Sequence, residues 1–457
     1  MRLKKLFSAA LAALLVLSLF SGCEVENPTT SELPTSESFP PPTDYVKYSG
    51  KWEETDEPLT ICITADLYEA DARNFCRKVK DLLDYHTGTS VKLEWVVLPE
   101  FDDDDGASAM LTRLRTELLA GGGPDVFICG GPGAGLAQDD NGRSNFTNLF
   151  PVPEKMLYND TFLPLDGLLE NPQYMHPENF QSTVLAAGRT EQGQLILPTI
   201  FTYSAVVLDK GELEGPAPES LKELAESPRE VALFTTNIAF MVGRLADFRT
   251  DEPLFSEEEL QDLAVQAMEF NERGVNVVRE NPNCTPLYLW NFGRHQLGMM
   301  FQDNEGKKKD YAILPQWDRE GGVTARIEQF VAVNRNTKQA NNAMFLLDAL
   351  LDPECLRGWG YQVETGAGLR LFGASILESN EPEGLAIDTT VAMRRIYEKA
   401  QDLRAVVDSQ ITSARFRSEI DPILNDFNFE LVLAESELDA CQAASNAYDK
   451  ILMVLAE

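Results

Sequence analysis

Positive charge and histidine are scarce in this sequence. Its 457 residues include 39 Lys and Arg against 73 Asp and Glu, for a formal net charge of −34. Such an excess of negative charge repels nucleic acid and anionic lipid headgroups, so we expect no nucleic-acid partner. The three histidines, His86, His176 and His295, are far apart in the sequence and match no metal-ligand spacing, so no metal site is predicted.

Motifs of enzymes and of cofactor-binding proteins are also missing. There is no Gly-x-Ser-x-Gly turn and no Cys/His set for nucleophilic catalysis. The glycine cluster 130–135 is not followed by Gly-Lys-Ser/Thr, and Gln138 replaces the last small residue of a dinucleotide fingerprint. The acidic run 102–105 fails EF-hand spacing. We predict no catalytic residue and no cofactor, although chance carboxylate pairs leave a glycan-cleaving enzyme open.

The long apolar run of this chain lies at residues 6–20. Basic residues precede it and Ser21-Gly22-Cys23 follow it, a pattern typical of a secretory signal peptide. Because a cysteine stands at the exit, the segment resembles a bacterial lipoprotein signal, which implies cleavage after residue 22 and lipidation of Cys23. The alternative is an ordinary signal peptide with an incidental cysteine. No later stretch reaches the roughly 18 apolar residues of a spanning helix.

Residues 23–58 read as the lipid anchor followed by a disordered tether. The segment is rich in Pro, Ser, Thr and Glu and has few large apolar residues. Such a composition buries too little surface to fold, and a flexible chain of this length spans on the order of 30 Å. It predicts a protein held at the extracellular face of the cell membrane.

Six cysteines follow Cys23, and they are widely spaced. An exported chain could pair them as disulfides. Cys62 and Cys129, however, lie inside apolar strand patterns, so we favour buried free thiols.

From residue 59 onward, strand and helix patterns alternate. Strands at 59–65, 91–97 and 126–129 are separated by helices at 72–83 and 111–118. This order predicts a parallel sheet covered by helices, with ligand-binding loops at the carboxyl ends of the strands. Further strands are predicted at 194–198, 205–208, 311–314 and 330–333, and further helices at 256–273, 341–351 and 440–455.

Several local sequences resemble those of the extracellular solute-binding proteins of bacterial ABC importers, family 1, which includes maltose-binding protein. The segments that carry the resemblance occur in the family's order, and the likeness spans about residues 59–457. In the first half they are the helix end, small-residue turn and buried strand at 118–126, the hinge strand at 193–198 and the following strand at 206–210. In the second half they are the strand at 311–315, the return hinge at 330–334 and the helix at 340–347.

The resemblance implies an α/β fold of two lobes, the type II fold of periplasmic binding proteins, with parallel-rich sheets flanked by helices. Hinge strands would join two discontinuous lobes: lobe 1 from 59–195 plus 328–375, and lobe 2 from 196–325 plus 380–457. A monomer would bind a small solute in the cleft between the lobes, and we expect this solute to be an oligosaccharide. The protein would then deliver it to an ABC permease. A surface-anchored enzyme acting on glycans, an adhesin and a sensor remain alternatives.

The resemblance also implies ligand-binding residues. Asp66 matches a position where sugar-binding members carry a carboxylate that accepts hydrogen bonds from sugar hydroxyl groups. The alternative is that Asp66 caps the amino terminus of a helix. Phe416 stands near the place of an aromatic residue that stacks on sugar, with core packing as the alternative. The remaining candidates are Tyr68, Gly131, Thr202, Tyr203, Trp290 and Trp317, of which the two tryptophans could equally belong to the core.

Overall fold

The computed structural model describes most of the chain beyond residue 44. The described ranges are 45–64, 69–97, 104–130, 149–209, 218–226, 237–280, 287–289, 311–353, 374–376 and 402–457. Every described residue belongs to the compact unit Pro41–Glu457. The predicted signal and Cys23 therefore lie outside the described residues.

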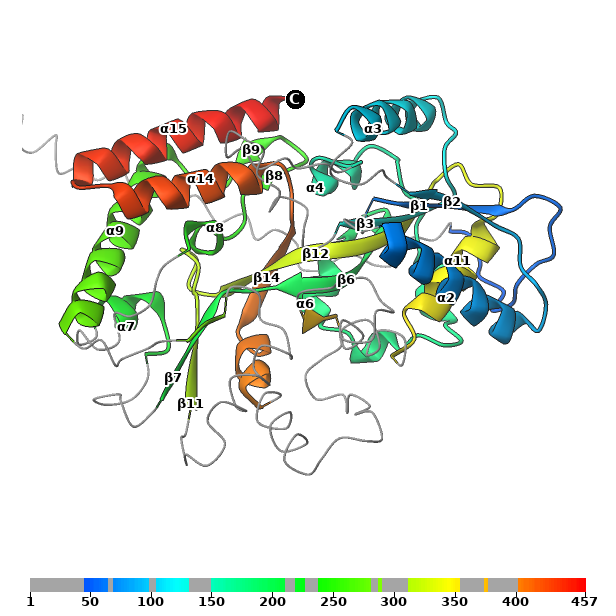
Figure 1. Ribbon diagram of the computed structural model, residues 1–457, viewed down its shortest axis with the longest axis horizontal. Coiled ribbons are helices and arrows are strands. Elements are labelled where there is room, and N and C mark those ends of the chain that lie inside the picture. The colour runs from blue at the N-terminus through cyan, green and yellow to red at the C-terminus, as the bar shows by residue number, and fades with distance from the viewer. Residues whose placement is uncertain are drawn as a thin grey trace, which may run out of the picture. The chain divides into compact units, whose positions relative to one another are not determined.

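The main sheet of the described residues has seven strands (Figure 1). Their order is β13-β6-β12-β3-β1-β2, and β14 also pairs with β12. Strands β1, β2 and β3 are parallel to one another, whereas β12 is antiparallel to both β3 and β6. The seven strands are β1 (Leu59–Ile63), β2 (Leu93–Val97), β3 (Val126–Gly130), β6 (Ile196–Thr202), β12 (Val323–Val333), β13 (Ala374–Ser375) and β14 (Ile411–Phe416).

The predicted β-α-β-α-β order at the start of this sheet is confirmed. Helix α2 (Glu69–Thr87) follows β1 and helix α3 (Asp104–Leu119) follows β2. Phe75, Val79 and Leu83 recur at helical spacing on α2 and are buried, as an amphipathic helix against a sheet requires. Gly121, just past α3, has a φ of 77°, the left-handed conformation in which helices commonly end.

Strand β12 is longer than its predicted part, residues 330–333. It begins at Val323, and all its 11 residues are buried. Its first half pairs with β14 in parallel, its second half pairs with β3, and β6 runs along its opposite edge. The earlier half alternates apolar and polar residues, a pattern that indicates a strand with one exposed face, so the sequence does not show that both faces are buried.

A second sheet and a set of packed helices lie outside the main sheet. Strand β7 (Ala205–Asp209) pairs antiparallel with β10 (Leu287–Leu289) and β11 (Tyr311–Pro315). Four helices pack against one another: α8 (Ile238–Met241), α9 (Glu257–Glu280), α14 (Ile420–Leu433) and α15 (Glu437–Ala456). Their buried side chains form a hydrophobic cluster of their own, drawn from residues inside the predicted lobe 2. The lobe boundaries themselves stay a prediction.

Helix α9 begins with the reciprocal hydrogen bonds of a capping box. The Glu259 amide donates to Ser256 Oγ at 3.2 Å, and the Ser256 amide donates to the Glu259 carboxylate at 2.7 Å. The remaining described elements are α4 (Pro153–Met156), α5 (Asp166–Glu170), η2 (Pro177–Asn179), α6 (Ser182–Ala186), α7 (Leu221–Glu226), α11 (Ala340–Leu350), β4 (Arg189–Thr190), β5 (Gly193–Gln194), β8 (Ala246–Asp247) and β9 (Glu252–Pro253).

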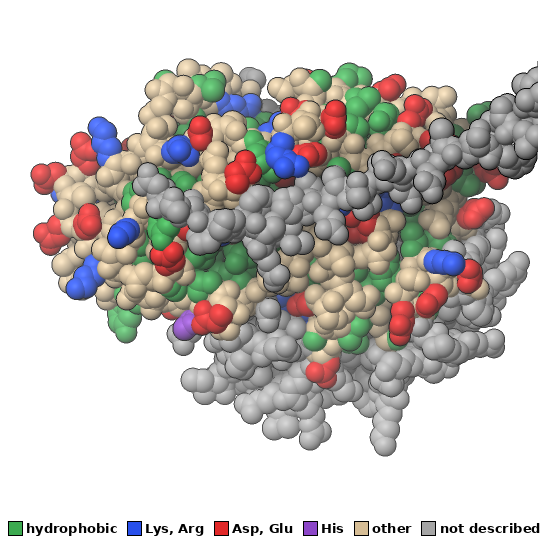
Figure 2. Space-filling view, turned by 180° about the vertical axis from the view of Figure 1, so that it is seen from behind, with side chains coloured by type: hydrophobic (Ala, Val, Ile, Leu, Met, Phe, Trp, Pro, Cys, Tyr) green, Lys and Arg blue, Asp and Glu red, His purple; other side chains and the backbone are tan. Residues whose placement is uncertain are grey.

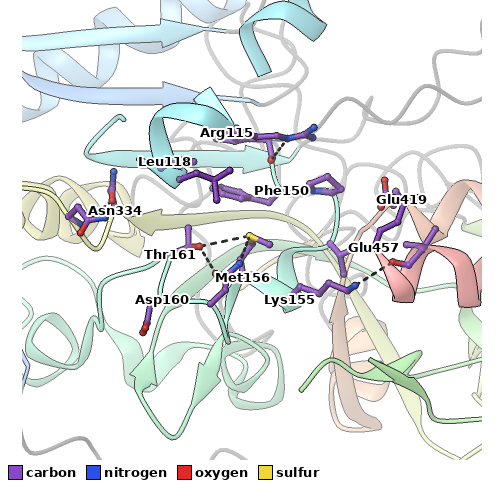
Figure 3. Close-up of a pocket in the computed structure, with 17 residues that line it drawn as sticks. Arg115, Leu118, Phe150, Lys155, Met156, Asp160, Thr161, Asn334, Glu419 and Glu457 are labelled. Carbon is purple, nitrogen blue, oxygen red and sulfur yellow. Dashed lines mark hydrogen bonds between the residues drawn. The ribbon is translucent and has the colours of Figure 1, made fainter. Parts of the chain in front are cut away.

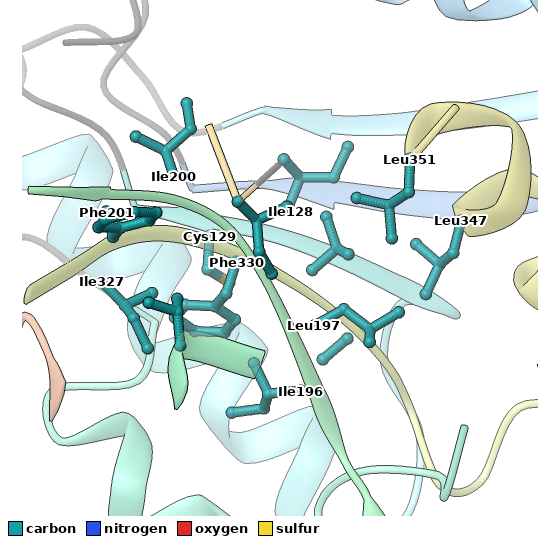
Figure 4. Packing of buried hydrophobic residues seen from close by; sticks show 14 of the residues in the cluster. Ile128, Cys129, Ile196, Leu197, Ile200, Phe201, Ile327, Phe330, Leu347 and Leu351 are labelled. Atoms are coloured by element: carbon teal, nitrogen blue, oxygen red, sulfur yellow. The ribbon is translucent and has the colours of Figure 1, made fainter. Parts of the chain in front are cut away.

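The larger hydrophobic cluster surrounds the seven-stranded sheet. Figure 4 shows Ile128 and Cys129 of β3, Leu197 of β6 and Phe330 of β12 packed together. Cys62 and Cys129 are fully buried, and the four described cysteines, which also include Cys76 and Cys441, are free. The two strand cysteines therefore behave as small core residues, as the apolar strand pattern predicts.

Residues 45–58, which the predicted tether included, belong to the folded body. Tyr48 is buried and its hydroxyl donates to the Asp348 carboxylate at 2.9 Å. The Glu53 amide donates to Asn342 Oδ1 at 2.8 Å, and the ring of Trp52 packs edge-on against Phe345 of α11. These contacts join residues almost 300 positions apart, so local composition could not reveal them.

Charges of both signs lie on the face of the molecule that Figure 2 shows. On the face in Figure 2, acidic side chains lie at several separate places with basic side chains among them. Across the described ranges, no helix is both long enough and apolar enough to cross a membrane.

Candidate functional site

The carboxyl ends of β1 and β3 lie side by side at one edge of the main sheet. Ile63 is in register with Ile128, and the Thr64 amide donates to the Ile128 carbonyl at 3.0 Å. Ligand loops of open α/β sheets begin at such an edge. Asp66, Tyr68 and Gly131 directly follow these strand ends, and Trp290 follows β10, but all four lie outside the described residues.

Thr202, at the end of β6, joins a buried polar network. Its hydroxyl donates to Glu328 Oε1 at 2.6 Å. The same carboxylate accepts hydrogen bonds from Arg326 Nε at 2.8 Å and from Arg417 Nη1 at 3.1 Å. Burial favours the neutral acid, but the two guanidinium groups outweigh it and lower the pKa of Glu328. Glu328 is therefore a carboxylate, shared by three donors.

Asp421, in the first turn of α14, is the second acid of this network. Arg415 binds it with two hydrogen bonds, at 2.7 and 2.9 Å, and Arg326 Nη1 lies 3.3 Å from Asp421 Oδ1. The Ser418 amide donates to Asp421 Oδ2 at 2.9 Å. The arginine charges overcome the effect of burial and lower the pKa of Asp421.

The network arises from strand periodicity. Residues two apart on a strand share a face, so Arg326 and Glu328 of β12 lie on the same face, as do Arg415 and Arg417 in the β14 segment. Arg326 is in register with Thr202 on one side and with Arg415 on the other. The charges hold β6, β12, β14 and α14 together where β12 leaves its pairing with β14 and begins its pairing with β3.

Glu154 of α4 lies next to this network and is also buried. Its Oε1 accepts a hydrogen bond from the Phe416 amide at 2.7 Å. Burial is the largest effect on this group and raises its pKa to about 7, although the charge of Arg415 acts in the opposite direction. Glu154 is thus the carboxyl of this region that titrates near neutral pH.

Tyr203, Trp317 and Phe416 lie within the larger hydrophobic cluster. Tyr203 and Phe416 are 0% exposed, and Trp317 is 2% exposed. Trp317 Nε1 donates to Gln410 Oε1 at 3.1 Å, and the ring of Phe416 lies edge-on to Phe330 at 5.3 Å. The structure shows the packing role for each of these side chains. Their contact with a ligand stays a prediction.

A pocket of about 540 Å³ lies elsewhere, beside α3, α4 and the end of α15 (Figure 3). None of the predicted ligand residues lines it. Its walls come from five separate segments, which include Arg115, Phe150, Met156, Glu419 and Val454. No sequence motif marks the pocket, because no single segment supplies more than part of the wall.

Cys76 and Cys129 are poor candidates for nucleophilic catalysis. Burial raises the pKa of Cys129 to about 12 and that of Cys76 to about 11, so both are protonated at neutral pH. Among the described residues there is also no group of three His, Cys, Asp or Glu side chains placed to hold a metal ion.

Comparison with known proteins rests on structure. No family model and no curated protein matches the sequence. The fold is similar to a family 1 extracellular solute-binding protein from Alicyclobacillus acidocaldarius, at 12% identity and a TM-score of 0.53, over 88% of this chain and 100% of that one. It is also similar to a de novo designed cysteine esterase, at 12% identity and a TM-score of 0.51, over 88% and 99%. The chain therefore has the two-lobed α/β fold of the family 1 extracellular solute-binding proteins.

Proposed function

We propose that this protein is the substrate-binding lipoprotein of an ABC importer. It captures an extracellular solute between two lobes and passes it to a membrane permease. The fold supports this proposal, as do the ordered sequence segments that resemble the family. The basic and apolar pattern before Cys23 supports export and a lipid anchor.

The observation that carries the proposal is the path of β6 and β12. Both strands are fully buried and pair antiparallel in the main sheet, and β6 is followed after two residues by β7 of the second sheet. On the other side, β11 of the second sheet precedes β12. Two adjacent strands that lead from one sheet into another can bend together as a hinge, which would allow a cleft to close on a ligand.

An oligosaccharide is the cargo we propose. The Asp66 carboxylate, just past β1, would accept hydrogen bonds from a pair of sugar hydroxyl groups. Tyr68 and Trp290 would offer aromatic faces to sugar rings. Thr202, Tyr203, Gly131, Trp317 and Phe416 complete the proposed ligand set. A cleft lined in this way suits a neutral polyol better than a metal or a nucleotide.

Thermal-shift screening of the purified protein tests solute binding. Sugars, peptides and polyamines are the compounds to screen. A solute present at about 100 times its dissociation constant stabilises the folded protein by about 2.7 kcal/mol. Small-angle scattering of the same sample should show a smaller radius of gyration with the bound solute, because the cleft closes. Asp66→Asn should weaken sugar binding, whereas Asp426→Asn, an exposed change on α14, serves as the matched control.

Two results would contradict solute transport. Hydrolysis of a glycan would favour the enzyme alternative, and binding of a polymer without closure would favour an adhesin or a sensor.

Cells that make the Cys23→Ala variant test the anchor separately. Labelled fatty acid should be incorporated by the original chain and not by the variant. Equal labelling of both chains would exclude lipidation at Cys23.

A further inference from the structure

The pocket beside α3, α4 and the end of α15 has the dimensions of a small-molecule site. Its volume of about 540 Å³ falls within the range of roughly 300–1,000 Å³ that is typical of ligand pockets. None of the residues proposed to bind the solute lines it, and its walls come from both predicted lobes. The chemistry of its walls determines which ligand it would accept.

One part of the wall is apolar. Figure 3 shows Leu118 of α3 next to Phe150, with Met156 of α4 nearby. Such a surface favours a hydrocarbon or aromatic body. The apolar lining residues are Leu118, Leu119, Leu149, Phe150, Pro151, Val152, Met156 and Val454.

The basic residues of the lining already have partners. Lys155 Nζ donates to the Leu455 carbonyl at 2.7 Å, at the end of α15, and lies 3.4 Å from Asp251 Oδ1. Arg115 Nε donates to the Leu149 carbonyl at 3.1 Å. These bonds direct both cations to the protein, so an anionic ligand gains little from them.

Two acidic residues of the lining, unlike these basic residues, have no partner for their side chains among the described residues. Among the described residues, the carboxylates of Glu419 and Glu457 make no hydrogen bond and no ion pair, whereas Asp160 pairs with Arg335 at 3.1 Å. Figure 3 shows Glu419 and Glu457 near each other on one wall. The carboxyl end of α15, which carries partial negative charge, lies at the same wall.

The charges around Glu419 also favour a cation next to its carboxylate. Burial and then the nearby charge of Glu457 raise its pKa, and Arg115 and Lys155 offset the rise only in part. A cation placed between the two carboxylates would relieve both effects, because it neutralises the repulsion and replaces lost solvation.

We propose that this pocket binds a small molecule that carries a protonated amine on an apolar body. The ammonium group lies between Glu419 and Glu457 and donates to both carboxylates. The body rests on Leu118, Phe150 and Met156. The site includes none of the residues proposed to bind the solute, so its test does not depend on the identity of that solute.

Titration calorimetry with a matched pair of probes tests the site. The probes are 4-phenylbutylamine and 4-phenylbutanol, which share a body and differ in the charged group. We expect saturable binding of the amine, with a dissociation constant at least about tenfold lower than that of the alcohol. Glu419→Gln should weaken amine binding by about tenfold or more and leave alcohol binding unchanged.

Two further variants locate the binding. Glu430→Gln removes the same charge from an exposed position on α14 outside the pocket and should leave amine binding unchanged. Val454→Trp fills the pocket and should abolish binding of both probes, with circular dichroism as the check on folding. Equal binding of amine and alcohol, an amine affinity insensitive to Glu419→Gln or Val454→Trp, or no saturable binding would each overturn the proposal.

Discussion

Glu154 and Glu328 are both buried carboxyl groups, yet the structure gives them different partners. Glu328 accepts hydrogen bonds from Arg326, Arg417 and Thr202. Glu154 accepts one from the Phe416 amide, and its Oε2 has no partner among the described residues. Guanidinium groups stabilise the ionised acid, whereas burial without such a group favours the neutral acid. The identity of the neighbours, rather than burial alone, therefore decides which acid is charged.

Glu154 should make stability depend on pH near neutrality. Its pKa rises from 4.5 to about 7 on folding, so the folded state holds the proton more tightly than the unfolded state. Below about pH 4.5, Glu154 is protonated in both states and does not change the free energy of unfolding. As the pH rises from about 4.5 to 7, the free energy of unfolding falls, and above that range the total loss is about 3 kcal/mol. Glu154→Gln mimics the neutral acid and should remove this loss, which urea unfolding between about pH 5 and pH 8 measures.

The control for this measurement is Glu430→Gln, which removes the same charge at an exposed site. It should retain the pH dependence of the original chain. If Glu154→Gln also retains that dependence, then Glu154 does not titrate in this range.

Asp421→Asn tests the second acid of the network. The substitution removes the negative charge that faces Arg415 and Arg326 and leaves two buried guanidinium groups without it. Breaking a buried ion pair in this way costs about 3–5 kcal/mol, so the unfolding free energy in urea at neutral pH should fall by that amount. Asp426→Asn, an exposed change on the same helix, should have an unfolding free energy within about 0.5 kcal/mol of that of the original chain.

At the scale of elements, the junction of β3 and β12 depends on a single glycine. Gly130 has a φ of 85°, and a Cβ atom there would collide with the Glu328 carbonyl oxygen. The end of β3 is therefore set by backbone contact as well as by side-chain packing. The sequence places Gly130 correctly at the end of a strand, but it does not show which backbone it contacts.

Gly130→Ala should destabilise the protein more than a comparable glycine substitution elsewhere. Gly321 has a φ of 86°, and no described atom lies within 4 Å of the position that a Cβ atom would take there. Gly321→Ala therefore measures the cost of the backbone conformation alone, about 1–2 kcal/mol. Gly130→Ala adds a backbone clash, and we expect it to cost at least about 2 kcal/mol more. Equal losses in urea unfolding would show that the contact with Glu328 is unimportant.

At the scale of the whole molecule, residues 45–58 join the folded body to the amino-terminal part of the chain. Asp348 of α11 accepts hydrogen bonds from the Tyr48 hydroxyl and from the amides of Gln173, Tyr174 and Met175. One buried carboxylate thus ties together three segments that are far apart in sequence. If the proposed lipid anchor and tether are present, the tether ends before this attachment.

Comparison of chains that begin at residue 45 and at residue 59 tests this attachment. The shorter chain lacks the buried Tyr48 side chain and the contact of Trp52 with Phe345. Loss of a buried aromatic side chain and its hydrogen bond should lower the unfolding free energy by about 3 kcal/mol or more. Equal stability of the two chains in urea would show that residues 45–58 are part of the tether after all.

The sequence by itself determined the alternation of strands and helices, the capping box of α9 and the apolar strands of the main sheet. These features depend on residues within one or two turns of each other, so their periodicity is visible locally. Only the tertiary structure revealed that Arg326, Glu328, Arg415 and Arg417 are interior residues, that β12 begins at Val323, and that a pocket lies beside α15. A charged strand is buried only when its partners are present, and here those partners come from β6, β14 and α14, far away along the chain.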